Sequence, residues 1–427
     1  MDWSNTTTIV NPATVSLEDQ FQDNATDHWT VSVFPTIVQK VRPFWYLSAG
    51  VRIGSNNNAL NRNQGKFRGL GTAVDSLSAY FETSEMFIKP SLSLRRSTAK
   101  SQVNLTLGSS WSRFDRVLDK TSLLKSDYLY LIPGFNYSSN YRQGRRVGLN
   151  YSSSVNMPNV NQLLPFTNTN NQLLQYRGNA DLKPEYRHNL DLSWSLFDHF
   201  SFTSLFTRVR GAYTRNRISL SRSVNSDFTQ VISPVNIDGH YSAMTYISFS
   251  TPVRKLGLTL NAVSSETVSR SKSIINGVDN IETVLSHTVD LNIENRRKGS
   301  LDLRIGGEIN VTDTRYSISA GNVFSNTKYY GKVRFTPSAN WRFETDANVV
   351  DYNSRSFNQS VRIPLINGSI SYDFLRGKKA SFTLHSFDLL NRNTGFQRAS
   401  ATSYLQEREW NTIGRYVMLT LNIRMGR

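Results

Sequence analysis

Apolar and polar residues alternate along most of the chain, and this alternation predicts β-strands. From residue 186 to residue 196 the even-numbered positions are Tyr, His, Leu, Leu, Trp and Leu, whereas the odd-numbered positions between them are polar. Residues 301–311 repeat the pattern, with Asp302, Arg304 and Glu308 on the polar face. A period of two residues is typical of an extended strand with one apolar face.

Connections between the predicted strands alternate between short and long. The short turns hold about four residues and the long connections roughly ten to thirty, a pattern typical of an outer-membrane barrel with short periplasmic turns and long extracellular loops. A soluble sandwich or propeller has shorter strands and lacks this alternation. We therefore predict an all-β fold, a transmembrane antiparallel up-and-down β-barrel in the cell outer membrane. The predicted short turns are 40–43, 97–100, 142–144, 198–199, 252–255, 296–299, 337–340 and 376–379.

The N-terminal residues lack this alternating pattern. Residues 1–28 are polar, and we expect a loop or a loop remnant there. The barrel is expected over residues 29–427 with roughly 17 strands, the first of them over residues 29–39. Single-chain bacterial barrels usually have an even number of strands, and the first predicted strand here starts from the long-loop side. Residues 1–12 carry neither a basic n-region nor an apolar h-region, so this stretch shows no export signal. We expect the chain to be the C-terminal part of a larger barrel, incomplete at its N-terminus.

Composition narrows the function classes. No run of eighteen apolar residues is present, which excludes a spanning helix but not spanning strands, because these need only about 9 to 11 alternating residues. The sequence has no cysteine, which excludes disulfides, thiolate zinc sites and cysteine nucleophiles. The formal charge of +17 comes from dispersed Lys and Arg residues. We therefore expect contacts with lipid and lipopolysaccharide, and no nucleic-acid partner.

One segment resembles a known family. The residues Met157-Pro158, Leu163-Leu164-Pro165 and Gly178-Asn179-Ala180-Asp181-Leu182-Lys183-Pro184-Glu185 resemble the signature P…L.P…GN..LKPE in the barrel of TonB-dependent outer-membrane receptors. In that family the signature closes an extracellular loop and starts a descending strand. We interpret its core residues as structural: Gly178, Asn179, Leu182, Lys183, Pro184 and Glu185.

The resemblance also implies a function. Receptors of this family capture a ligand with their long loops and import it through the barrel, with a plug domain inside the barrel and energy from the TonB complex. The present chain shows no plug and no TonB box, so a TonB complex is expected as a partner only if a plug lies upstream. The ligand is unknown. Its candidate surface is the set of long loops 54–78, 156–184, 215–236 and 391–407, without individual binding residues.

Catalysis finds no support in the sequence. The histidines are scattered without metal-site spacing, and there is no GxSxG elbow or phosphate-binding glycine loop. His188 and His287 lie in phase with apolar faces, which favours packing, and Asp302 and Glu308 fit charge pairs across neighbouring strands. We expect no enzyme activity, no cofactor and no metal. A passive porin and a non-transporting barrel that serves adhesion or a partner remain alternatives to a receptor, and an outer-membrane hydrolase lacks its catalytic set.

Overall fold

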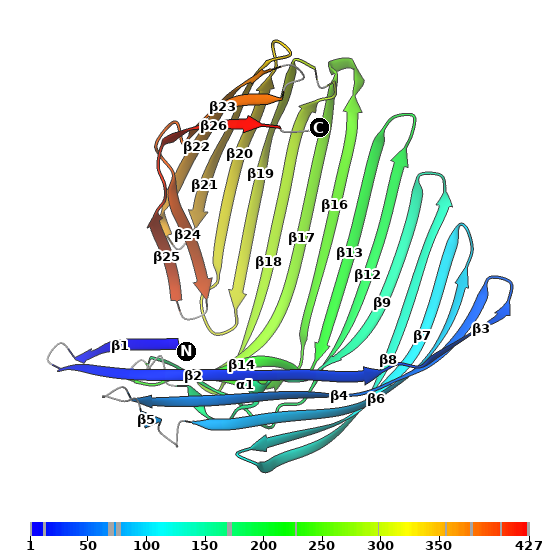
Figure 1. Cartoon of the computed structure of the whole chain (residues 1–427), viewed down its shortest axis with the longest axis vertical. Helices are drawn as coiled ribbons and strands as arrows, with labels where there is room; N and C mark the ends of the chain where they lie inside the picture. The colour runs from blue at the N-terminus through cyan, green and yellow to red at the C-terminus, as the bar shows by residue number, and fades with distance from the viewer. Residues whose placement is uncertain are drawn as a thin grey trace.

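The fold is known from a computed structural model that describes residues 2–11, 14–66, 72–73, 78–168, 173–226, 229–297, 299–354, 357–375, 379–401 and 404–424. One antiparallel meander forms most of it (Figure 1). Its strands, in chain order, are β2 (Thr14–Val33), β3 (Thr36–Arg42), β4 (Trp45–Lys66), β6 (Ala79–Ser97), β7 (Ser101–Leu118), β8 (Thr121–Arg142), β9 (Arg145–Asn156), β12 (Glu185–Asp198), β13 (Thr203–Arg215), β16 (His240–Val253), β17 (Leu258–Ile275), β18 (Val278–Asn295), β19 (Leu301–Tyr316), β20 (Asn322–Phe335), β21 (Trp341–Ser354), β22 (Phe357–Phe374), β23 (Ala380–Phe387) and β26 (Tyr416–Ile423).

β2 and β3 both pair with β4 along successive parts of its length, and from β4 onward each strand of this wall pairs with the next one in the order given. We call the end of the wall with the tight turns the short-turn end, and the opposite end the long-loop end. In Figure 1, β2, β4 and β6 run across the lower part of the view while β12, β13, β16, β17 and β18 stand nearly upright, so the sheet coils strongly.

The remaining elements lie at the two ends of the wall strands. At the long-loop end lie β1 (Asp2–Asn11), β5 (Thr72–Ala73), α1 (Val160–Leu163), β10 (Thr167–Asn168), β11 (Leu174–Arg177), β14 (Arg217–Val224), β15 (Gln230–Ile237), β24 (Thr394–Ala401) and β25 (Tyr404–Asn411). The short 3-10 helix η1 (Arg254–Leu256) forms the turn between β16 and β17. No helix among the described residues is long and apolar enough to cross a membrane.

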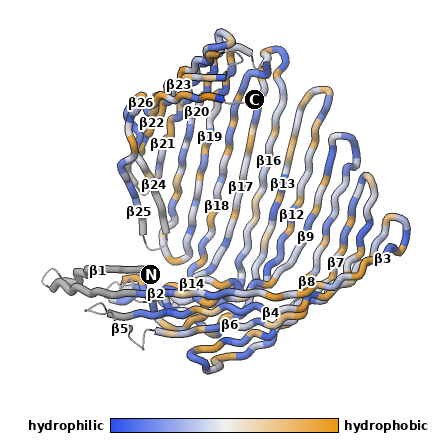
Figure 2. Tube along the Cα trace, viewed as in Figure 1, coloured by the Kyte–Doolittle hydropathy of each residue, from blue (hydrophilic) through white to orange (hydrophobic). Residues whose placement is uncertain are grey.

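Strand register places the apolar series on one face of the wall. Ile293 on β18 lies opposite Ile305 on β19, and Leu303 lies opposite Val333 on β20. Figure 2 shows the alternation of apolar and polar residues along these strands. An apolar surface of this size is unfavourable in contact with water but is solvated by the hydrocarbon of a bilayer. We therefore call this face the lipid-facing belt, and the polar face is the interior. Exposed members of the belt include Leu47, Leu94, Leu107, Leu192, Val209, Ile247, Leu291, Ile305, Phe343, Ile370, Leu384 and Leu419.

The wall is an open sheet over the described residues. β26 pairs with β23, and no described pairing joins β26 to β1, β2 or β3. Both edges therefore keep backbone groups that a closed barrel would pair. The predicted antiparallel β-barrel architecture is confirmed in its strands, their order and their two-faced pattern.

Several predicted loops are strands in the structure. Residues 1–28 were expected to be a loop remnant, yet the described part contains β1 and most of β2, and residues 54–66 continue β4. The predicted loops 215–236 and 391–407 likewise contain the hairpins β14–β15 and β24–β25. These extensions lie beyond the apolar belt, so neither of their faces meets lipid and the sequence needs no sustained period of two.

The predicted short turns lie between strands. Residues 98–100, 143–144, 296–300 and 336–340 each connect two wall strands, while 376–378 of the predicted turn 376–379 lie outside the described residues. The first predicted strand, from residue 29 to residue 39, is divided at Phe34-Pro35 into the end of β2 and the start of β3. Proline cannot donate a ladder hydrogen bond, which accounts for the break.

Candidate functional site

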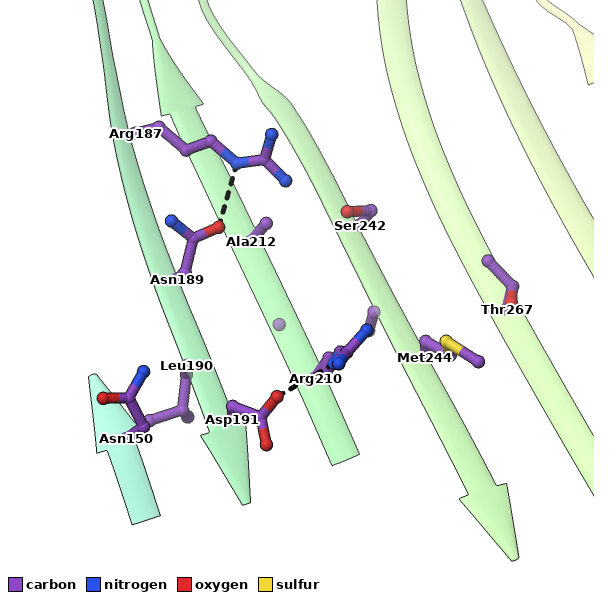
Figure 3. Close-up of a pocket in the computed structure, with 12 residues that line it drawn as sticks. Asn150, Arg187, Asn189, Leu190, Asp191, Arg210, Ala212, Ser242, Met244 and Thr267 are labelled. Atoms are coloured by element: carbon purple, nitrogen blue, oxygen red, sulfur yellow. Dashed lines mark hydrogen bonds and ion pairs between the residues drawn. The ribbon is translucent and has the colours of Figure 1, made fainter. Parts of the chain in front are cut away.

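A hollow opens on the interior face of the wall, where β9, β12, β13, β16 and β17 lie side by side (Figure 3). The tight connection after Asp198 sets the register, which places Asp191 opposite Arg210 and Arg187 opposite Thr214. The hollow has a volume of about 430 Å³, within the range of small-molecule sites. We call it the lumen hollow. It is lined by Asn150, Arg187, Asn189, Leu190, Asp191, Arg210, Gly211, Ala212, Ser242, Ala243, Met244 and Thr267.

Positive charge is in excess around the lumen hollow. Arg208 Nη2 and Arg210 Nε lie 2.6 Å and 2.8 Å from the same oxygen, Oδ2 of Asp191. Arg187 adds a third guanidinium, whose Nε donates to the neutral Asn189 Oδ1 at 2.9 Å (Figure 3). Three guanidinium groups and one carboxylate thus lie in or beside the hollow. Such a site attracts anionic groups, and arginine can bind a carboxylate or phosphate with two hydrogen bonds.

A second feature of the interior is the segment that carries the signature residues. Asn159 caps α1: its side chain accepts from Gln162 N at 2.9 Å, and the Gln162 side chain accepts from Asn159 N at 3.0 Å. This reciprocal capping box fixes a single helical turn that would otherwise be too short to persist. The turn delivers Leu163 and Leu164, both fully buried, and Asn179 N donates to Gln162 O at 2.7 Å.

These leucines join the main apolar cluster of the described structure. Its partners from the wall sit on the interior face, because Leu60 lies opposite Phe81 and Thr83 lies opposite Arg116 in the register. The signature segment therefore packs inside the wall near the long-loop end. We call this cluster the signature core; it comprises Leu60, Ala79, Phe81, Phe114, Val160, Leu163, Leu164 and Leu182.

Two residues fit the segment tightly to the wall. A Cβ atom at Gly178 would lie 2.2 Å from the Leu164 carbonyl oxygen, so only glycine allows this approach. Arg116 is completely buried and donates to Leu182 O at 2.9 Å, to Tyr128 Oη at 3.1 Å and to Ser126 Oγ at 3.2 Å. A buried cation needs such acceptors, because an unmade hydrogen bond there is costly.

Signature residues also bind the neighbouring hairpin β14–β15. Asn179 Nδ2 donates to Pro234 O at 3.1 Å, and Lys183 exchanges two hydrogen bonds with Asn236 through its backbone, at 2.8 Å and 2.9 Å. The Glu185 carboxylate accepts from Ile218 N at 2.8 Å. A short parallel pairing of β11 with β15 adds a further link. The predicted loops 156–184 and 215–236 thus form one connected unit.

Comparison with known proteins also indicates an outer-membrane β-barrel. The model of an outer membrane protein β-barrel family matches residues 4–422. The chain belongs to this outer-membrane β-barrel family. Membership places the protein in the cell outer membrane, as predicted. A search among curated protein sequences gives no match.

The barrel is also similar to a solved structure, the ferric enterobactin receptor PfeA in complex with BCV-L6. Sequence identity is 9% and the TM-score is 0.25, over 96% of this chain and 82% of that chain. The likeness says nothing about what the present barrel binds. The predicted resemblance to an outer-membrane β-barrel is confirmed by the family match.

The structure places the predicted site residues in different settings. Gly178, Asn179, Leu182 and Glu185 make the contacts given above, and Pro184 is fully buried. The part of loop 156–184 around them is packed core, whereas Leu173 and Leu174 of the same loop are exposed, so the role of this loop as a ligand surface stays a prediction. Burial raises the pKa of the nearby Tyr176 phenol above its ordinary value.

The structure describes only part of the other two candidate loops, 54–78 and 391–407. Residues 54–66 lie in β4, while 67–71 and 74–77 lie outside the described residues. The hairpin within 391–407 rests on Asp388, which is almost fully buried and accepts from Arg392 N at 3.0 Å and Asn393 N at 2.9 Å. These hydrogen bonds fix where the hairpin β24–β25 leaves the wall. The role of loop 391–407 in ligand binding stays a prediction.

Histidines form no joint site in the described part of the chain. His188 packs among the rings of Tyr151, Tyr186 and Tyr213, and its Nδ1 lies 2.8 Å from Tyr151 Oη, in line with the packed role predicted for it. His287 pairs with Glu266. Among the described residues no group of three or more His, Cys, Asp or Glu side chains has the geometry to hold a metal ion.

Proposed function

We propose that this outer-membrane β-barrel is the wall of a TonB-dependent receptor that captures an anionic ligand and imports it. The observation that carries the proposal is the signature core. A motif that resembles the receptor family folds into a defined unit on the interior wall, with Gly178 seated on Leu164 and Leu182 fully buried. The proposal assigns no catalytic step, cofactor or metal to the barrel.

The lumen hollow supports an anionic ligand. Arg187 and Arg210 are within reach of a solute in the interior, and Asp191 neutralises only one of the three nearby guanidinium groups. A ligand that carries carboxylate, phosphate or another anionic group would gain charge-assisted hydrogen bonds there. The TonB complex enters the proposal as the energy source, acting on a plug supplied upstream.

Uptake in living cells tests the proposal. Cells that depend on this barrel are grown with one limiting nutrient at a time, among iron chelates, cobalamin, glycans and peptides. They carry the native chain, the double variant Arg187→Gln with Arg210→Gln, or the control Arg113→Gln with Arg315→Gln. The control removes the same charge from exposed side chains near the long-loop end. We expect the interior variant alone to reduce uptake of one nutrient, by about tenfold or more for two lost charged hydrogen bonds.

Dependence on energy separates a receptor from its alternatives. Dissipating the proton-motive force should abolish uptake of that nutrient by the native chain. Uptake that continues unchanged would identify a passive porin. If no nutrient depends on the barrel while cell adhesion or a surface partner does, the transport proposal fails in favour of a non-transporting platform.

A further inference from the structure

Four turns at the short-turn end form one continuous surface. Phe197 N donates to Gly144 O at 2.7 Å, which joins the β8–β9 turn to the β12–β13 turn. Arg254 donates to Phe200 O, and the Arg296 guanidinium lies 5.5 Å from the centre of the Phe202 ring. Arg296 N donates to Gly257 O at 2.9 Å. The turns of four successive hairpins are therefore held together side by side.

This surface is strongly basic. Two of its turns read Arg254-Lys255-Leu256-Gly257 and Arg296-Arg297-Lys298-Gly299, without an acidic residue. The carboxylate of Asp198 is satisfied within its own turn, where it accepts from Ser201 Oγ at 2.7 Å and from Phe200 N at 3.0 Å. We call the surface the rim patch. Its described basic residues are Arg142, Arg145, Arg254, Lys255, Arg296 and Arg297.

Large apolar side chains stand between these charges. Phe200 is 88% exposed, Leu256 70% and Phe202 54%. A periplasmic turn in free water gains nothing from such exposure. The same side chains next to a bilayer would enter the boundary between head groups and acyl chains, where aromatic residues are favoured.

A concave site lies within the rim patch. The hollow has a volume of about 480 Å³ and is lined by Arg142, Arg145, Phe197, His199 and Phe200, among others. It therefore combines guanidinium groups with aromatic walls. The outward face of the same strands belongs to the lipid-facing belt, through Leu192 on β12 and Val209 on β13.

We infer that the rim patch binds the phosphate head group of an anionic phospholipid in the inner leaflet of the outer membrane. Short turns of outer-membrane barrels lie on the periplasmic side, so the patch is level with that leaflet. Positive charge fits the head group, and Phe200, Phe202 and Leu256 fit the start of the acyl chains. The inference does not depend on whether the barrel imports a ligand.

Retention of lipid by the purified full chain tests the inference. The chain is reconstituted in vesicles of equal phosphatidylcholine and phosphatidylglycerol at low ionic strength and extracted in mild detergent. The bound lipids are then quantified by mass spectrometry. We expect the native chain to retain phosphatidylglycerol preferentially. The triple variant Arg142→Gln, Lys255→Gln, Arg297→Gln should lose this preference, by about fivefold for each charge removed from an anionic surface.

Matched variants separate a specific loss of lipid binding from a general effect of lost charge or altered folding. The triple variant leaves Arg254 and Arg296, which hold the turns together, in place. The control Arg113→Gln, Arg315→Gln, Arg362→Gln removes the same charge near the long-loop end, where these side chains are 57%, 67% and 70% exposed. Arg142→Lys with Arg297→Lys keeps the charge and should keep the preference. Circular dichroism verifies that each variant keeps its strands.

Two outcomes would overturn the inference. If the control loses the preference as much as the rim variant, net charge acts at a distance and the rim patch has no special role. If the native chain retains both lipids equally, the patch does not bind phospholipid, and an acidic periplasmic protein becomes the partner to seek.

Discussion

Gly178 illustrates how a single residue positions an entire segment. Its missing side chain lets the chain approach the Leu164 backbone, and the approach brings Leu182 into the signature core. The signature pattern in the sequence drew attention to this glycine and to Asn179. It gave no sign of Arg116, because the bond from Arg116 to Leu182 O joins residues 66 positions apart. Such a contact depends on packing that no local pattern encodes.

Substituting Gly178 with alanine should destabilise the barrel. The added Cβ would meet the Leu164 carbonyl oxygen at 2.2 Å, so the segment must shift, and overpacking of this kind costs about 1–3 kcal/mol. The free energy of unfolding, from urea titration of the reconstituted protein, measures the effect. Gly211→Ala is the control, since a Cβ there meets nothing within 4 Å. Equal losses at both positions would contradict the packing role of Gly178.

Arg116→Lys should loosen the signature segment although the charge is kept. A lysine ammonium cannot serve the three acceptors Leu182 O, Tyr128 Oη and Ser126 Oγ in the planar geometry of a guanidinium. We expect a loss of about 1–3 kcal/mol and faster proteolysis of residues 156–184. Arg113→Lys, whose side chain is 57% exposed, should change neither. Unchanged proteolysis in Arg116→Lys would mean that the hydrogen bonds do not hold the segment.

The residues of the lumen hollow were predictable in principle. Counting outward from the turn at Asp198 places Asp191 opposite Arg210, and Ser193 opposite Arg208, as the structure has them. The pairing depends on the exact length of the turn, because a shift of one residue would place other side chains opposite Asp191. The predicted turn at Asp198-His199 was also shorter than the one observed, because residues 201 and 202 are part of the turn before β13 starts at Thr203.

At the scale of elements, alternation identified strands wherever one face meets lipid and the other the interior. It failed for β14, β15 and the distal half of β4, which contains the run Asn56-Asn57-Asn58. Here neither face meets lipid, and only single apolar residues such as Leu60 and Ile218 pack in or against the signature core. Hydrophobic periodicity therefore marked the membrane portion of the wall and missed the strands that rise beyond it.

The assignment of faces can be tested on β19. Ile305 is half exposed on the lipid-facing belt, so Ile305→Arg should cost about 2–4 kcal/mol near the bilayer midplane. The same applies to an arginine or lysine at Leu303. Arg304 faces the interior beside Tyr330, and Arg304→Gln should cost less than about 1 kcal/mol. The yield of assembled protein and its free energy of unfolding in lipid report the difference. Similar costs on both faces would refute the assignment.

The whole molecule is taller than the membrane that holds it. β4 and β8 have 22 residues each, whereas the apolar band of a barrel is about 25 Å high. At about 3.3 Å per residue and a tilt near 45°, such strands rise roughly 50 Å. The additional height stands at the long-loop end, where the strands were not predicted. Chain length and composition indicated a single large β-domain, but they did not predict how far its strands extend beyond the bilayer.

Thiol labelling can measure the height, because the native sequence has no cysteine to interfere. Leu47 and Asn61 lie on the same face of β4, fourteen positions apart. In intact cells a membrane-impermeant maleimide should label Asn61→Cys and leave Leu47→Cys unreacted, since only the latter lies in the lipid-facing belt. Labelling in detergent, where both should react more readily, is the control. Equal labelling in cells would place the membrane elsewhere on the wall.

The signature core makes the interior face of the wall asymmetric. It covers part of the interior face of β4, β6 and β7 with packed apolar side chains, whereas the arginines of the lumen hollow lie on β12 and β13. Under the proposed transport function, an imported solute would therefore meet an apolar surface on one side of the wall and a cationic surface on the other.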